Sequence, residues 1–176
     1  MGQRMVRFIS VSTAAFVFET TALDGSDLRT VTVPKDAQRT FTSYRFTGGV
    51  VSIEPPRATW DFCITQYTHQ FYEPVIAYLV NGALIDGTTT RVARIDGRAF
   101  ADLTLNDTLA FPFSNARNAI GYDWKVYSFE TSSYTVVPDR SYIVQDGEGW
   151  FHKLRFTDFY GSSGQSGCPT FEVVHL

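Results

Sequence analysis

The side chains of this sequence best suited to hold a metal ion are its three histidines and two cysteines. His69 is the candidate metal ligand, and it falls in an aromatic stretch, residues 67–72 (YTHQFY). If the strand that begins near Trp60 continues through this stretch, Cys63, Tyr67 and His69 share one face, since side chains alternate along a strand. Neutral imidazole and thiolate both bind transition metals well. The pattern offers His69 as a metal ligand, with a structural histidine packed among aromatic rings as the alternative.

The sequence contains no familiar catalytic motif. It has no phosphate-binding loop, no dinucleotide fingerprint, no G-x-S-x-G nucleophile elbow and no H-E-x-x-H zinc motif. Its acidic residues are scattered, and nothing singles out a pair for hydrolysis among Asp61, Glu73, Asp123 and Glu130. We therefore expect a binding protein rather than an enzyme.

Composition limits the class of protein further. The 176 residues carry a net charge of −3, and no surplus of lysine and arginine marks a nucleic-acid surface. No apolar run approaches the roughly 20 residues of a membrane-spanning helix. Aromatic residues are plentiful, with 15 Phe, 9 Tyr and 3 Trp against 2 Met and 3 His. Because aromatic and β-branched residues favour strands, this composition indicates an all-β protein.

The strands predicted from alternation and turn residues are short and spaced as in a β-sandwich or curved sheet. They cover residues 6–19, 28–33, 40–46, 49–54, 59–68, 75–80, 90–95, 124–129, 133–137, 141–145, 150–159 and 169–175. Alternation makes residues 6–19 a first strand rather than a secretion leader. Asn81 and Gly82 predict a two-residue hairpin turn, because both residue types tolerate positive φ. We expect one antiparallel domain over residues 1–176, with at most one short helix near 98–105.

The stretch from residue 98 to residue 123 is less regular than the rest. It contains large apolar side chains that would be poorly placed in water, namely Leu109, Phe111, Phe113 and Ile120. A long irregular stretch inside a compact domain either packs on the core or forms the wall of a ligand cleft. We favour the packed loop.

Several stretches together resemble the HmuY family. The similarity runs from about Phe41 to the C-terminus, and its most specific parts are residues 60–67 (WDFCITQY) and 153–160 (KLRFTDFY). It is extended by residues 121–125 (GYDWK), 134–138 (YTVVP) and 167–172 (GCPTFE). The resemblance implies an all-β fold and an exported lipoprotein of Bacteroidota, at the cell surface or in the periplasm, anchored to the outer membrane through a segment outside this chain. It also implies haem capture for iron acquisition.

The resemblance further implies that haem iron is held by two His or Met side chains, and Phe129 occupies one of those positions here. Phenylalanine cannot coordinate iron, and residues 71–150 contain no His and no Met. We therefore expect any haem to be held by a different set, either His69 or phenolate ligands such as Tyr122 and Tyr127.

Two functional hypotheses follow. The first is a binding protein for haem or a related porphyrin, with Tyr67, His69, Tyr122, Tyr127 and Phe129 as ligand-binding residues, because aromatic rings suit a flat apolar macrocycle. The second is a non-enzymatic module that keeps the fold without the cofactor and binds a cell-surface protein through exposed aromatic residues.

Overall fold

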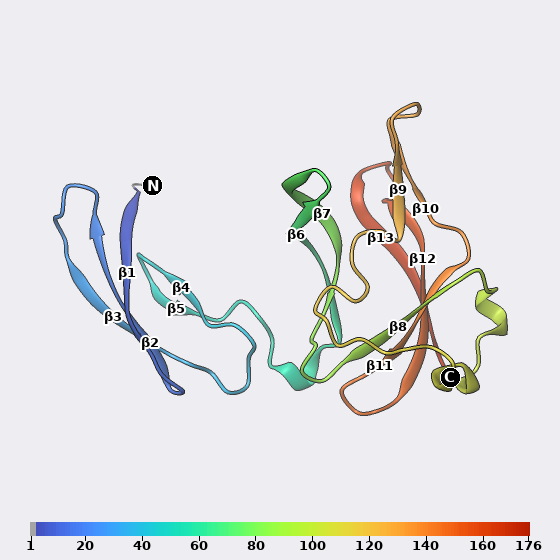
Figure 1. Cartoon of the computed structure of the whole chain (residues 1–176), viewed down its shortest axis with the longest axis horizontal. Helices are drawn as coiled ribbons and strands as arrows, with labels where there is room; N and C mark the ends of the chain where they lie inside the picture. Colours follow the sequence, from blue (N-terminus) through green and yellow to red (C-terminus); the bar gives the residue numbers. More distant parts are fainter. Residues whose placement is uncertain (1–2) are drawn as a thin grey trace. The chain divides into compact units, whose positions relative to one another are not determined.

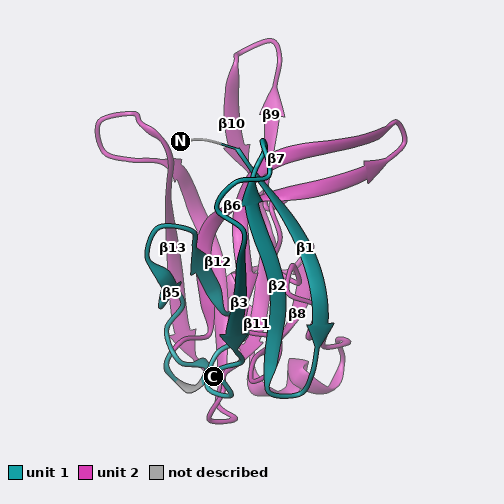
Figure 2. Cartoon of the chain, turned by 90° about the vertical axis from the view of Figure 1, so that its left-hand side faces the viewer, with its two compact units in different colours: residues 1–59 teal, residues 60–176 magenta. Residues whose placement is uncertain are grey.

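The computed structural model describes residues 3–176, apart from the side chain of residue 58. It confirms the all-β prediction, since 53% of the chain is strand and only short 3-10 turns lie between the strands. The strands form several antiparallel sheets, none of which is closed. Contacts within the chain group into two compact units that divide after Thr59 (Figure 2). A single domain over residues 1–176 stays a prediction.

The first unit holds a three-stranded sheet and a two-stranded sheet (Figure 1). Its strands are β1 (Arg4–Val11), β2 (Ala15–Ala22), β3 (Arg29–Pro34), β4 (Ser43–Arg45) and β5 (Gly49–Val51), paired in the orders β1-β2-β3 and β4-β5. A small aromatic cluster joins the two sheets. The ring of Phe18 is buried, with its centre 5.8 Å from that of Phe8 and 5.3 Å from that of Tyr44.

The single strand predicted over residues 6–19 is wrong, because the structure has two strands there, β1 and β2. Ser12 makes the turn between them. Its hydroxyl accepts hydrogen bonds from the backbone N–H groups of Ala14 and Ala15, and its own N–H donates to the carbonyl of Ala15. Alternation with period two resumes after so short a turn, so the pattern alone did not reveal it.

The second unit begins at Trp60 and holds eight strands. They are β6 (Phe62–Tyr72), β7 (Val75–Ile85), β8 (Arg91–Asp96), β9 (Lys125–Ser128), β10 (Ser133–Val136), β11 (Arg140–Gln145), β12 (Phe151–Tyr160) and β13 (Ser166–His175). Four of them form a sheet in the order β13-β12-β11-β8, while β6 pairs with β7 and β9 pairs with β10. Figure 1 shows these two hairpins extending at the same end of the four-stranded sheet.

The core of the second unit is aromatic. Trp124 is 1% exposed and stacks on Phe156, with ring centres 3.9 Å apart and an interplanar angle of 12°. The buried residues around this pair are Ala83, Ile85, Val92, Ile120, Tyr142, Val144, Leu154 and Phe159. Because Trp124 immediately precedes β9, this packing fixes where the β9–β10 hairpin starts.

The irregular stretch packs mostly on the core, as we expected. Phe111 and Phe113 lie against a second buried cluster that contains Ile143, and Ile120 belongs to the main core, whereas Leu109 is exposed. Residues 98–105 form no α-helix. The chain there makes two 3-10 turns, η2 (Phe100–Asp102) and η3 (Leu105–Leu109).

The hairpin turn predicted at Asn81 and Gly82 is also wrong. Both residues lie inside β7, and the chain reverses at Glu73 and Pro74, between β6 and β7. Gly82 has a different role, because a Cβ there would lie 2.4 Å from the carbonyl oxygen of Gly121. That carbonyl accepts a 2.8 Å hydrogen bond from the N–H of Ala83. Glycine at position 82 thus allows a distant backbone segment to approach β7 closely.

Candidate functional site

The strand face predicted to carry His69 exists. Along β6, Cys63, Tyr67 and His69 are half-buried, while the intervening residues Ile64 and Thr68 are exposed. The strand therefore keeps the expected alternation over this range, and β6 continues past its predicted end to Tyr72. The face of His69 is turned toward the segment that leads into β9.

His69 lies in a cluster of three rings. The centre of its imidazole is 4.7 Å from that of Phe71 and 4.8 Å from that of Tyr122, and the latter two rings are 5.9 Å apart. Among the described residues, no group of three or more His, Cys, Asp or Glu side chains is arranged to hold a metal ion. His69 as a metal ligand stays a prediction.

Tyr67 lies in β6 two residues before His69, and its hydroxyl group is shielded from water. Its hydroxyl is buried and has no hydrogen-bond partner among residues 3–176. Burial, with the nearby Tyr122 and the Asp123 charge, raises the pKa of Tyr67 to about 12. A phenolate is therefore strongly disfavoured at this position.

A cleft of about 340 Å³ lies between the β6–β7 hairpin and the β9–β10 hairpin, and we call it the aromatic cleft. Its lining residues are Phe71, Tyr78, Leu79, Val80, Asn81, Tyr122, Lys125, Tyr127 and Tyr134. Five of these nine residues are aromatic, and four carry a phenol hydroxyl. The cleft therefore offers flat apolar walls with oxygen atoms at intervals, which is the composition typical of a small-molecule site.

The structure brings some of the predicted residues together here and leaves others outside. Tyr122 and Tyr127 line the cleft, whereas His69 and Tyr67 are not among its lining residues, although the His69 ring packs against that of Tyr122. Tyr127 is packed against Tyr134, with ring centres 5.0 Å apart. Phe129 is 91% exposed in the turn after β9, and its ring touches Tyr127 at 5.2 Å between centres. Burial and the Asp123 charge raise the pKa of Tyr122, so its phenolate is disfavoured as well.

Lys125 is a residue of this site that the sequence did not reveal. It is 7% exposed, and its Nζ donates to the backbone carbonyls of Asn81, at 2.5 Å, and Tyr122, at 3.2 Å. These two bonds connect β7 to the segment before β9. Burial lowers the pKa of Lys125 to about 8, against an opposing effect of the Asp123 charge. Its neighbours Trp124 and Val126 give no hint of a buried amine, since lysine is mostly exposed.

Ion pairs of Asp123 also hold the segment before β9. Asp123 pairs with Arg94, at 2.7 Å, and with Arg140, at 3.3 Å. Arg140 also donates to the backbone carbonyl of Asp123 at 2.5 Å and pairs with Asp96 at 2.7 Å. Because Asp123 lies between Tyr122 and Lys125, these contacts help to fix both side chains of the cleft wall. Asp123, one of the scattered acidic residues of the sequence, therefore has a structural role in this ion-pair network.

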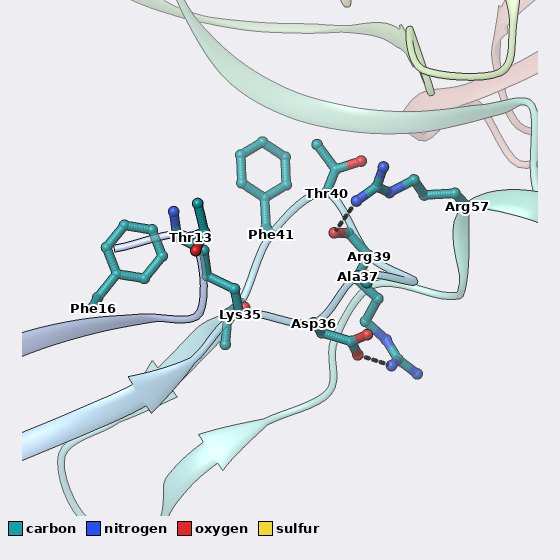
Figure 3. Close-up of a pocket in the computed structure, with 10 residues that line it drawn as sticks. Thr13, Phe16, Lys35, Asp36, Ala37, Arg39, Thr40, Phe41 and Arg57 are labelled. Carbon is teal, nitrogen blue, oxygen red and sulfur yellow. Dashed lines mark hydrogen bonds and ion pairs between the residues drawn. The ribbon is translucent and has the colours of Figure 1, made fainter. Parts of the chain in front are cut away.

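A larger cleft, of about 470 Å³, lies within the first unit. Figure 3 shows Arg57 pointing to the carbonyl of Arg39 and the carboxylate of Asp36 paired with the Arg39 guanidinium. The ammonium of Lys35 lies 4.7 Å from the ring centre of Phe16. The charges of this cleft are largely engaged with the protein itself, and it contains none of the predicted ligand residues. The aromatic cleft of the second unit is therefore the better candidate.

The fold and this cleft define an all-β protein with an aromatic cleft between two hairpins. The family model for HmuY protein matches residues 7–173, nearly the whole chain, and the chain therefore belongs to the HmuY family. Membership supports a protein of the haem-binding type in general. No curated protein and no solved structure matches the chain. In the described part of the chain, no helix has the length and apolar character needed to cross a membrane.

Proposed function

We propose that this protein binds haem or a related porphyrin in the aromatic cleft and serves iron acquisition. The observation that carries the proposal is the gathering of five aromatic rings around one cleft of about 340 Å³. A flat apolar macrocycle gains both buried area and ring stacking in such a site. Family membership supports the same class of ligand and an exported protein of Bacteroidota, a lipoprotein at the outer membrane, working at the cell surface or in the periplasm.

The aromatic walls of the cleft fit an apolar macrocycle. For the iron, the described residues offer tyrosine hydroxyl groups and the imidazole of His69. Haem supplies the iron centre when bound, and proteins hold that iron through His or Tyr as well as Met or Cys. Tyr127 lines the cleft directly, and the ring of His69 lies 4.8 Å from that of Tyr122, next to the cleft lining. Because the raised pKa of Tyr122 disfavours its phenolate, Tyr127 and His69 are the two candidates for the iron contact. Phe129 would then cover the open side of the cleft next to Tyr127.

Haemin titration of the purified protein tests this proposal. We expect a shifted Soret band and saturation at micromolar haemin, with the spectrum altered in either Tyr127→Phe or His69→Ala, whichever residue contacts iron. Iron-free protoporphyrin should still bind to both variants, because the ring contacts remain. Tyr44→Phe, the same substitution in the first unit, serves as the control. Absence of a spectral change in the wild-type protein at micromolar haemin would refute haem binding.

A second candidate function is a non-enzymatic module that binds a cell-surface protein. It is favoured by apolar side chains at the ends of the two hairpins, because exposed apolar patches mark interaction sites. Tyr72 and Val75 are 76% and 79% exposed, and Phe129 is 91% exposed. Indifference to haemin, combined with loss of partner binding in Phe129→Ala, would favour this function over the first.

A further inference from the structure

Lys125 places a buried ammonium group in the wall of the aromatic cleft. Its Nζ lies 4.4 Å from the ring centre of Trp124, 4.7 Å from that of Phe159 and 5.4 Å from that of Tyr134. Aromatic faces attract a cation, but they replace its hydration only in part. The lowered pKa of Lys125 expresses that deficit. The charge therefore gains more from a further polar partner than an exposed lysine would.

A second lysine of the same unit has an ammonium group with a hydrogen-bond acceptor for each of its protons. Lys153 donates to three backbone carbonyls, those of Phe100 at 2.9 Å, Ala101 at 3.2 Å and Leu103 at 3.1 Å. An ammonium group has three protons to donate, so Lys153 uses all of them. Lys125 donates to two carbonyls within the described residues, which leaves one proton without a protein acceptor.

Residues 3–176 supply no ion-pair partner for the Lys125 ammonium. The acidic charge that acts on the Lys125 ammonium is that of Asp123, and this carboxylate is already paired with Arg94 at 2.7 Å and with Arg140 at 3.3 Å. The other polar groups of the cleft lining are neutral, namely the tyrosine hydroxyls and the Asn81 amide. An anionic group brought by a ligand would meet a charged donor that is itself largely shielded from water, where such bonds are strong.

We propose that Lys125 is the anion-binding residue of the aromatic cleft, and that the ligand of this cleft is a flat apolar molecule that carries a carboxylate. The inference rests on the proposed function in that it assigns the ligand site to this cleft. It adds the chemical group that the ligand must present and the residue that receives it. The carboxylate accepts the third proton of the Lys125 ammonium, while the rings of the cleft hold the apolar body.

Paired ligands that differ only in the charge of their carboxylates test the inference at pH 7. Haemin is compared with haemin dimethyl ester, and 1-pyrenebutyrate with its methyl ester, by absorbance and by fluorescence. For each pair that binds, we expect the free acid to bind the wild-type protein at least about tenfold more tightly than its ester, because the ester cannot form the charge-assisted hydrogen bond to Lys125. Lys125→Met should bring acid and ester to the same affinity. Lys153→Met, the same substitution at a lysine outside the cleft lining, should keep the preference.

The outcomes separate this inference from haem binding itself. If haemin and its ester bind equally well to the wild-type protein, the inference is overturned while haem binding stands. If neither haem compound binds but pyrenebutyrate is preferred over its ester in a Lys125-dependent way, the inference stands and the proposed ligand is wrong. If neither haem compound binds, and 1-pyrenebutyrate and its ester bind equally well or not at all, the inference is overturned. The comparison of ligands on the wild-type protein does not depend on the folding of any variant.

Discussion

We expect the buried amine of Lys125 to contribute a stability that rises with pH, in a range where most side chains do not titrate. Burial lowers the pKa of Lys125 from 10.5 to about 8 in the folded protein. Between these values the unfolded chain holds a proton that the folded protein has released, so the free energy of unfolding increases as pH rises. Integrating this difference from pH 7 to pH 9.5 gives about 2 kcal/mol for the single amine. In Lys125→Met this contribution is absent.

The measurement is urea unfolding followed by tryptophan fluorescence, at several pH values from 7 to 9.5. The difference in unfolding free energy between wild type and Lys125→Met cancels the titration of all other groups. It should grow in favour of the wild type by about 2 kcal/mol over this range. The range stops at pH 9.5 to avoid the titration of Tyr67. Burial raises the pKa of Tyr67 from 10.0 to about 12, so its contribution to the free energy of unfolding is constant below about pH 9.5 and is lost as the pH rises from about 10 to 12.

Lys125→Arg provides the matched control. Arginine stays charged throughout this range, so this variant should lack the rise in stability with pH although it keeps the positive charge. A difference between wild type and Lys125→Met that stays constant from pH 7 to pH 9.5 would refute the reasoning, since it would mean that the amine keeps the same protonation in the folded and unfolded states.

Two further substitutions test the packing around the cleft. Gly82→Ala would place a Cβ 2.4 Å from the backbone oxygen of Gly121, so we expect the free energy of unfolding to fall by about 3 kcal/mol in chemical unfolding. Gly48→Ala is the control, because the nearest contact of its Cβ is 3.5 Å, and it should change the free energy of unfolding by less than about 0.5 kcal/mol. Equal effects of the two substitutions would contradict the close approach of Gly121 to Gly82. Tyr67→Phe removes a buried hydroxyl that has no partner among the described residues, and should raise the stability by about 1 kcal/mol in the same assay. A loss of stability there would show that the hydroxyl is hydrogen-bonded.

The strands were largely predictable because their signal is local. The face shared by Cys63, Tyr67 and His69 follows from alternation within one strand, and the structure has it. Chain reversals were harder to predict. Ser12 turns the chain without breaking the alternation. Gly82 suggests a turn in the sequence but lies inside β7, where the close backbone of Gly121 leaves no room for a Cβ. A glycine looks the same in a sequence whether a turn or a neighbouring backbone requires it.

The candidate site was predictable in part. Tyr122 and Tyr127 are predicted as phenolate ligands that could replace the ligands implied by the family resemblance, and both line the aromatic cleft, while His69 packs against Tyr122. Phe129 was named from the family resemblance and lies exposed beside Tyr127. Lys125 was missed, because nothing in the residues next to it indicates that its amine is buried.

The sequence by itself determined the all-β class, most strand positions and the aromatic content from which a cleft could be built. Only the tertiary structure decided which aromatic residues share a cleft and which amine is buried there. The physical reason is distance along the chain, since the carbonyls that bind Lys125 belong to residues 81 and 122 and its ring neighbours include Phe159. Burial and hydrogen bonding of this kind arise from segments that meet only in the folded protein, and periodicity within a strand carries no trace of them.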